Sequence, residues 1–277
     1  MNILIILIFA AIIHACWNAY IKNKGNSLNK VVILYSLISL YAIPFTFFIE
    51  LPSGRTFIYL FVSVIAHTMY MHSLARAYTY NDFSVAYPFA RGLAPLLTIL
   101  ILILIFGKSI TISEFIGILI IVLAIFILLE FKKINYSMKG ILSLLYFPLS
   151  IGFYTIVDAM GVRSTDSPEQ FIIWLFVLIP IPLSAYVLIN NKNALKLTFV
   201  ENKYSLIVAS IGSLTSYSLV LWAYTQAPIY YVASIRESSI IFASLIGLIF
   251  FKEKGLLRRL LASMVLFAGV VILEYSS

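Results

Sequence analysis

The chain has few charged residues and no long polar stretch. Only 11% of its 277 residues are Asp, Glu, Lys or Arg, whereas a soluble domain carries about 25%. Hydrophobic residues make up 62% of the chain, and the mean hydropathy is +1.03. These values exclude an ordinary soluble protein and leave no segment for a separate soluble domain.

The sequence also lacks the common signatures of catalysis and cofactor binding. Its single cysteine, Cys16, cannot form an intramolecular disulfide. A glycine-rich phosphate-binding loop of the form GxxxxGK[ST], HExxH, CxxC and GxSxG are all missing. We therefore expect a protein that is not an enzyme, has no cofactor or metal, and does not use ATP.

Long apolar stretches dominate what is present. A bilayer core about 30 Å thick needs roughly 20 apolar residues per helix, and only helices pair all backbone groups in stretches this long. The first stretch has no basic residue before it and no small-residue cleavage site, so we expect a spanning helix rather than a signal peptide. We expect ten such helices, at 2–21, 30–49, 56–79, 84–106, 112–130, 138–158, 169–189, 204–226, 231–250 and 256–274.

The net charge of +8 arises from basic residues in the short connections, so we expect no nucleic acid partner. On one side of the membrane, the loops between the expected helices have only three basic residues, Arg55, Lys108 and Arg163. Because cytoplasmic loops are rich in Lys and Arg, we expect the other side to be cytoplasmic and both termini to be extracytoplasmic. The loops on the expected cytoplasmic side have 13 basic residues: Lys22, Lys24, Lys30, Lys132, Lys133, Lys139, Lys192, Lys196, Lys203, Lys252, Lys254, Arg258 and Arg259.

An internal repeat relates the two halves of the chain. Residues spaced along the third and fourth helices recur about 145 residues later: Ala77-Tyr78-Thr79, Val85-Ala86, Arg91 and Phe106 as Ala223-Tyr224-Thr225, Val232-Ala233, Arg236 and Phe251. Five helices per copy would insert the second copy upside down, and inverted repeats of this kind form a site at the bilayer midplane. We expect an all-α membrane protein with ten transmembrane helices in two inverted five-helix repeats, residues 1–131 and 132–277.

Polar residues deep in spanning helices are candidate functional residues, because their burial in lipid is costly. His14, Trp17 and Asn18 share one face of the first helix. The sixth helix has Tyr154 and Asp158, each 140 residues after His14 and Asn18. These five residues either bind substrate or a proton, or only form hydrogen bonds between helices.

Two arginines occupy matching positions in the repeats. Arg91 lies about 10 Å inside the fourth helix, after Tyr87 and Pro88, and its counterpart Arg236 precedes Glu237. The arginine fork suits a carboxylate or phosphate. The alternatives are a structural ion pair or a side chain that reaches the membrane surface.

The third helix contains two histidines on different faces, His67 and His72. Histidine titrates near neutral pH, so the candidates for proton coupling are His14, His67, His72 and Asp158. Tyr78 shares a face with His67, and Trp222 is either a pocket wall or an interfacial anchor.

Six segments carry a family likeness. They are His14-Ala15-Cys16-Trp17-Asn18-Ala19-Tyr20-Ile21-Lys22, Ala75-Arg76-Ala77-Tyr78, Asp82-Phe83-Ser84-Val85-Ala86-Tyr87-Pro88, Arg91-Gly92-Leu93-Ala94-Pro95, Arg236-Glu237 and Phe251-Lys252-Glu253. Together these segments resemble the EamA branch of the drug/metabolite transporter superfamily. The family usually has an acidic residue after the fourth helix of a repeat, where the first copy here has Lys108. The resemblance implies transport of small metabolites such as amino acids, sugars or organic cations, by uniport, exchange or proton coupling.

The two arginines favour an anionic group on the substrate, while Asp158 and Glu237 suit an amine. We therefore expect alternating-access transport of an amino acid, or another zwitterionic or anionic metabolite, across the inner membrane. The alternatives are a membrane-embedded enzyme acting on a lipid or small metabolite, and an exporter of organic cations or drugs. The expected partners are the lipid bilayer, the small-molecule substrate, and a proton or counter-substrate, with the carrier a monomer or homodimer.

Overall fold

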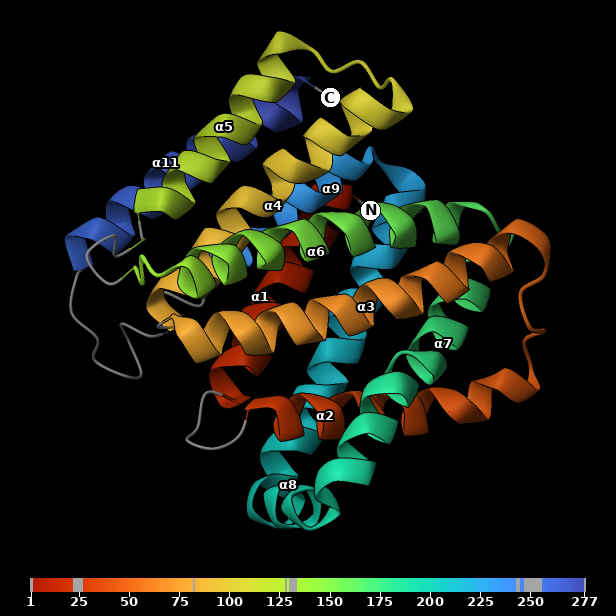
Figure 1. Ribbon diagram of the computed structural model, residues 1–277. Coiled ribbons are helices and arrows are strands. Elements are labelled where there is room, and N and C mark those ends of the chain that lie inside the picture. The colour runs from red at the N-terminus through yellow and green to blue at the C-terminus, as the bar shows by residue number, and fades with distance from the viewer. Residues whose placement is uncertain are drawn as a thin grey trace.

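The computed structural model describes residues 2–21, 27–81, 83–127, 129, 134–242, 245–246 and 256–276. It is 88% helical, without a strand among the described residues. Figure 1 shows the helices, which are α1 (Ile3–Ile21), α2 (Ser27–Ala42), the 3-10 helix η1 (Ile43–Phe47), α3 (Gly54–Tyr80), α4 (Phe83–Phe106), α5 (Ile112–Ile127), α6 (Met138–Arg163), α7 (Pro168–Leu178), α8 (Pro180–Gln226), α9 (Ile229–Arg236) and α11 (Leu256–Ser276).

Six of the described helices are long and apolar enough to cross a membrane. The predicted boundaries agree to within two residues for four helices, namely 2–21 with α1, 56–79 with α3, 84–106 with α4 and 256–274 with α11. Long apolar stretches fix these helices, because the residues after each stretch cannot remain in lipid. The arrangement of ten spanning helices in two repeats stays a prediction.

Several predicted boundaries were wrong. The predicted helix 138–158 continues to Arg163, whose guanidinium Nε and Nη2 donate to Tyr224 O and Ala227 O, each at 2.5 Å. This pairing satisfies free carbonyls at the end of α8, because the last carbonyls of a helix lack partners within it. The segment 190–203, expected as a connection, is helical and belongs to α8.

The predicted helix 169–189 breaks at Ile179, because Pro180 has no backbone N–H and starts a new helix.

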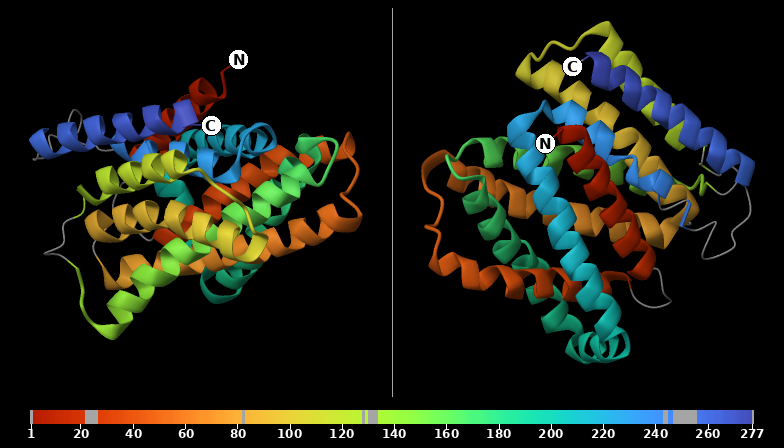
Figure 2. Two further views of the ribbon diagram at one scale, coloured as in Figure 1. Left: turned by 90° about the horizontal axis from the view of Figure 1, so that it is seen from above. Right: turned by 180° about the vertical axis from the view of Figure 1, so that it is seen from behind.

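The segment 190–203 of α8 is helical because its Ala, Leu, Lys and Glu residues, which lie in 194–203, favour a helix. Figures 1 and 2 show the ribbon of α8 bending back on itself at the edge of the molecule opposite the chain ends.

Close helix packing surrounds the middle of the molecule. Helix α3 packs against α6, α1 against α8, and α5 against α11. At the last contact a Cβ added to Gly269 would lie 2.9 Å from Gly117 O, and one added to Gly117 would lie 3.0 Å from Leu273 N. The two backbones therefore touch, as small residues allow between helices in a membrane.

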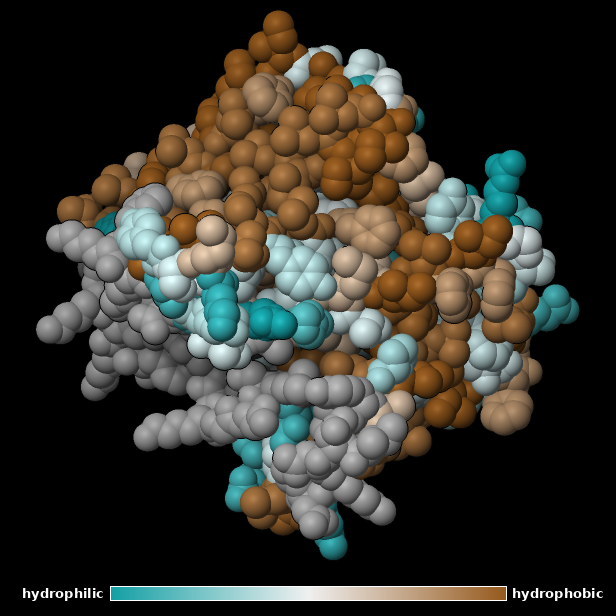
Figure 3. Space-filling model, viewed as in Figure 1, coloured by the Kyte–Doolittle hydropathy of each residue, from teal (hydrophilic) through white to brown (hydrophobic). Residues whose placement is uncertain are grey.

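The outer surface is strongly apolar. Figure 3 shows hydrophobic residues covering the upper part of the molecule, over α4 and α5. Leu104 and Ile112 are 79% and 80% exposed there, and Phe267 on α11 is 69% exposed. Large exposed apolar patches are found where a protein contacts lipid or another protein.

Candidate functional site

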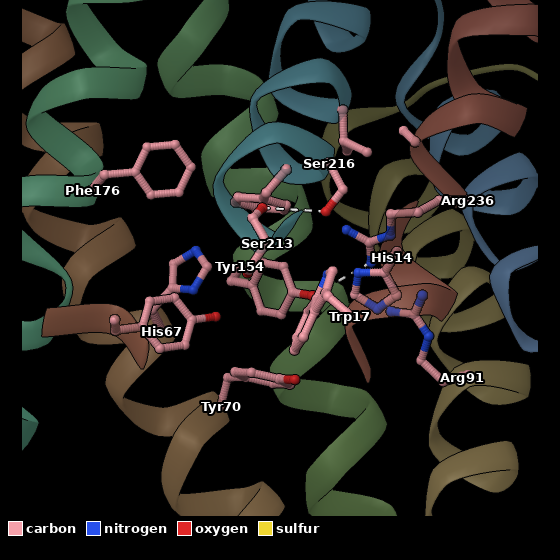
Figure 4. Close-up of a pocket in the computed structure, with 14 residues that line it drawn as sticks. His14, Trp17, His67, Tyr70, Arg91, Tyr154, Phe176, Ser213, Ser216 and Arg236 are labelled. Carbon is pink, nitrogen blue, oxygen red and sulfur yellow. Dashed lines mark hydrogen bonds between the residues drawn. The ribbon is translucent and has the colours of Figure 1, made fainter. Parts of the chain in front are cut away.

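A small cavity of about 70 Å³ lies between helices of both halves of the chain. A single water needs about 10–15 Å³ of such space, so the cavity has room for several waters or a small polar molecule. Figure 4 shows the side chains that surround it. They come from eight helices: Ala10, His14, Trp17, Tyr35, His67, Tyr70, Arg91, Tyr154, Phe176, Ser213, Ser216, Tyr217, Val220 and Arg236.

Two arginines form one end of the cavity. Arg91 Nε lies 2.6 Å from Glu237 Oε2, and Arg236 Nη2 lies 3.7 Å from Glu237 Oε1. Arg91 Nη2 also donates to Ser239 Oγ (3.3 Å), and Arg236 Nη2 donates to Tyr154 Oη (3.4 Å). All three charged side chains are buried, and together they have a net charge of +1. We call this group of Arg91, Arg236 and Glu237 the arginine end.

A break in the helix brings Arg236 and Glu237 together. Adjacent residues of a regular α-helix do not face each other. Helix α9 ends at Arg236, and the next turn has the tighter 3-10 spacing, with Glu237 N donating to Ser234 O (3.1 Å) and Ser238 N donating to Ile235 O (3.0 Å). Short 3-10 stretches inside helices often mark functional positions.

Asp158 is the centre of a hydrogen-bond network at the other end. It is fully buried, and it accepts hydrogen bonds from Ser63 Oγ and Tyr217 Oη. His67 Nε2 lies 2.8 Å from Asp158 Oδ2, and the His67 ring stacks on Tyr154 with centroids 4.6 Å apart. Figure 4 shows His67 on the side of the cavity opposite Arg91 and Arg236, with Tyr154 between them. We call Asp158, Ser63, His67 and Tyr217 the Asp158 network.

Three nitrogen atoms around the cavity are buried without a hydrogen-bond partner among the described residues. They are Trp17 Nε1, His67 Nδ1 and Arg236 Nε. Leaving a buried polar atom unpaired costs about 1–3 kcal/mol, and such atoms are uncommon in native structures. All three belong to residues that line the cavity, so a polar molecule bound there would supply the missing partners.

The structure brings six of the residues singled out in the sequence to the cavity wall: His14, Trp17, His67, Arg91, Tyr154 and Arg236. Asp158 and Glu237 lie behind the wall, bonded to residues that form it. His72 is exposed, with its ring 6.0 Å from that of Tyr146, and Trp222 packs against the hydrophobic core, so neither lines the cavity. The side chains of Asn18, Tyr78 and Tyr87 lie outside the described residues.

Sequence reasoning missed several residues of the cavity wall. These are Tyr35, Tyr70, Ser213, Ser216 and Tyr217. Ser213, Ser216 and Tyr217 recur at helical spacing of three and four, a polar stripe within an apolar helix. That stripe was the available signal, whereas single tyrosines in a chain with 18 of them gave none.

The fold and the apolar helices define a helical integral membrane protein, and its interior contains a polar cavity. Residues 138–275 match the EamA-like transporter family, which belongs to the drug/metabolite transporter superfamily. Through this match the chain is identified as a member of the EamA-like transporter family, and thus as a membrane transporter of the drug/metabolite type.

Comparison with solved structures shows the same fold elsewhere. One crystal structure, whose title names no function, matches 99% of this chain and 99% of its own with a TM-score of 0.74 and 12% sequence identity. At that identity the likeness concerns the fold alone. A comparison with curated protein sequences finds no significant match.

Proposed function

We propose that the protein is a secondary transporter with ten transmembrane helices in two inverted repeats, residues 1–131 and 132–277. It moves a small zwitterionic metabolite, with an amino acid as the best fit, by alternating access across the inner membrane of the cell. A proton or a counter-substrate accompanies transport, and the carrier is a monomer or homodimer. The observation that carries the proposal is a polar cavity, lined by matching positions of both halves, with two arginines in the wall at one end and the Asp158 carboxylate behind the wall at the other.

Matching positions of the two halves meet at the cavity. Five pairs of lining residues are separated by 140–146 positions in the sequence: His14 and Tyr154, Tyr35 and Phe176, His67 and Ser213, Tyr70 and Ser216, and Arg91 and Arg236. A site at the interface of two inverted repeats is expected to draw on the same helices of each copy. This pairing supports the repeat architecture and a cavity at its pseudo-symmetry axis.

Helix packing follows the same pattern. The first helix of one half packs against the third of the other, since α1 contacts α8 and α6 contacts α3. The fourth helix of each half contacts the first helix of the other half, since α9 contacts α1 and α4 contacts α6. Rocking of one half against the other would therefore open the cavity to one side and close it to the other, as alternating access requires.

The charges around the cavity favour a zwitterion. The arginine end has a net charge of +1 and faces a substrate carboxylate, for which the guanidinium fork is suited. The Asp158 network at the opposite end contains the carboxylate that attracts an amine. A molecule with both groups on a short skeleton fits a cavity of about 70 Å³ better than a large drug.

Uptake into liposomes tests the proposal. Purified protein is reconstituted, and accumulation of a ¹⁴C-labelled mixture of amino acids is measured against empty liposomes. We expect uptake that is lost in Arg91→Gln and kept in Arg55→Gln, since Arg55 is exposed at the start of α3. Absence of amino-acid uptake by the parent protein contradicts the proposed substrate class, and chemical conversion of a labelled compound would point to an enzyme.

One observation favours a second candidate, an exporter of organic cations. Six aromatic side chains line the cavity, namely Trp17, Tyr35, Tyr70, Tyr154, Phe176 and Tyr217, and aromatic faces attract cations. The two arginines in the same wall oppose this substrate. We expect tetraphenylphosphonium to leave amino-acid uptake unchanged, whereas its own transport by the reconstituted protein would favour the exporter.

Membrane orientation is the remaining part of the proposal. The imbalance of 13 basic residues against three predicts that both termini are extracytoplasmic. Figure 1 shows the N- and C-terminal ends both in the upper half of the view, away from the bend of α8. We expect a C-terminal alkaline phosphatase fusion to be active and a C-terminal green fluorescent protein to be dark. Bright fluorescence with an inactive phosphatase would reverse the orientation.

A further inference from the structure

We propose that Glu237 determines substrate specificity by limiting the arginine end to one unit of net positive charge. The carrier then accepts a substrate with one carboxylate and rejects one with two. This inference rests on the proposed function in one respect, the assignment of the arginines to an anionic group of the substrate. It does not require that the substrate be an amino acid.

The contacts of Glu237 carry the proposal. Its two carboxylate oxygens approach both arginines, at 2.6 Å from Arg91 Nε and 3.7 Å from Arg236 Nη2. Glu237 is 1% exposed and each arginine is 5% exposed. Water screens charges poorly at such depth, so each unit of charge changes the affinity for an anion strongly. With two cations and one anion, the site has one positive charge left for a ligand.

Glu237 acts from behind the cavity wall. Both arginines line the cavity, whereas Glu237 is not among the lining residues. The 3-10 turn after α9 fixes its position, and Ser239 from the same turn accepts a hydrogen bond from Arg91 Nη2 at 3.3 Å. A ligand in the cavity therefore meets the arginines while Glu237 remains bound to them, so the glutamate tunes the site without touching the ligand.

The other buried carboxylate does not replace Glu237 in this role. Asp158 lies at the far end, where Ser63, His67 and Tyr217 surround it. Arg236 approaches that end only through Tyr154, whose hydroxyl accepts from Arg236 Nη2 and whose ring lies 5.8 Å from Arg236 Cζ. The charge offered to a carboxylate is therefore set by Arg91, Arg236 and Glu237.

Two small probes test this inference without transport. Acetate has one carboxylate and malonate has two, and their binding to purified protein in detergent is followed by the fluorescence of Trp17, which lines the cavity. Trp174 and Trp222 are replaced by Phe in every variant. We expect the parent to bind acetate more tightly than malonate. In Glu237→Gln the residual charge rises to +2, and the malonate-to-acetate affinity ratio should rise tenfold or more.

Control variants separate charge from shape. Glu114→Gln removes a carboxylate that accepts hydrogen bonds from Thr111 N before α5 and from Tyr230 Oη on α9, and it should leave the ratio unchanged. Arg236→Gln lowers the residual charge to zero and should weaken both probes. The double variant Arg236→Gln/Glu237→Gln returns the residual charge to +1, so the preference for acetate should return. These last two variants decide the matter if Glu237→Gln fails to fold.

Several results would overturn the inference. They are an unchanged ratio in Glu237→Gln, a parent protein that prefers malonate or binds neither probe, and a double variant that does not favour acetate. The outcomes are distinct from those for the proposed substrate. A parent that transports no amino acid but shows the expected probe ratios contradicts the proposed function and leaves the role of Glu237 standing.

Discussion

The two ends of the cavity hold buried charge in opposite ways. At the arginine end, two guanidinium groups share the single carboxylate of Glu237, and Arg236 Nε has no partner among the described residues. In the Asp158 network, one carboxylate is surrounded by the side chains of Ser63, His67 and Tyr217. One end has donors in excess, whereas the acceptor at the other end is saturated.

The difference indicates what each end does. Excess buried donors are costly unless a ligand or water occupies them, so the arginine end is the better place for a substrate anion. The Asp158 carboxylate accepts hydrogen bonds from Ser63 and Tyr217 beside His67 and is held firmly by this network. Under the proposed function, the arginine end binds the substrate carboxylate, and the Asp158 network attracts the amine and is a candidate site for proton coupling.

The largest effect is expected from Arg91→Ala, which breaks the arginine end. Removing one partner of a buried ion pair costs about 3–5 kcal/mol, so unfolding should occur at markedly lower temperature and amino-acid uptake should be lost. Arg91→Lys keeps the charge but loses the fork and should retain part of both. Thermal unfolding in detergent measures the first effect. If Arg91→Ala unfolds at the same temperature as the parent protein and takes up amino acids at the same rate, Arg91 makes no functional contact.

The double variant Arg91→Ala/Glu237→Ala sharpens this test. In Arg91→Ala, the Glu237 carboxylate keeps only its weaker partner, Arg236, which lies 3.7 Å away in the intact protein. The double variant removes this carboxylate as well. Stability should therefore recover in part relative to Arg91→Ala, since coupled residues are not additive. A double variant less stable than Arg91→Ala would show that Glu237 has another essential partner.

An intermediate effect is expected from Asp158→Asn, which changes the opposite end. The amide retains one oxygen acceptor but brings its own donors toward Tyr217 and His67, at a cost of about 1–3 kcal/mol. We expect accumulation driven by a pH gradient to disappear while exchange of labelled for unlabelled amino acid continues. His14→Ala, on the arginine side of Figure 4, tests the competing candidate for the proton site. Uptake by the parent protein without pH dependence removes the premise for both residues.

The smallest effect is expected from Tyr217→Phe, which removes one donor to Asp158. The carboxylate keeps Ser63 and His67 as partners, so the loss of stability should be about 1 kcal/mol and substrate affinity should change little. Tyr204→Phe is the matched control, since Tyr204 is exposed on the same helix. A stability change in Tyr217→Phe as large as that of Arg91→Ala would mean that the network is not redundant.

Long apolar stretches made the boundaries of α1, α3, α4 and α11 predictable, because lipid leaves no other choice for a backbone of that length. The helical turn of α8 was not predictable in this way, since the residues after Asn193 favour a helix even where they leave the membrane. Polar side chains in spanning helices identified six residues of the cavity wall for a similar reason. Burial of charge is expensive in any context, so such residues stand out in a sequence.

The partners within the site could not be read from the sequence. Adjacent residues of a regular helix do not pair, so neither the joint action of Arg236 and Glu237 nor the contact of Glu237 with Arg91 on a distant helix was evident. The 3-10 turn after α9 permits both contacts. The donors to Asp158 come from α3 and α8, and only the folded arrangement reveals which of several serines and tyrosines reach it.

Access to Ser213 tests the central claim most directly, because this residue lies in the cavity wall and is 6% exposed. Ser213→Cys is made in a Cys16→Ser background, which removes the only other cysteine. A membrane-impermeant maleimide is then applied to right-side-out and to inside-out membrane vesicles. Alternating access predicts that Cys at this position is labelled from both sides, and that the amino-acid mixture slows the labelling. Labelling from one side only, or from neither, would contradict a cavity that opens in turn to each side of the membrane.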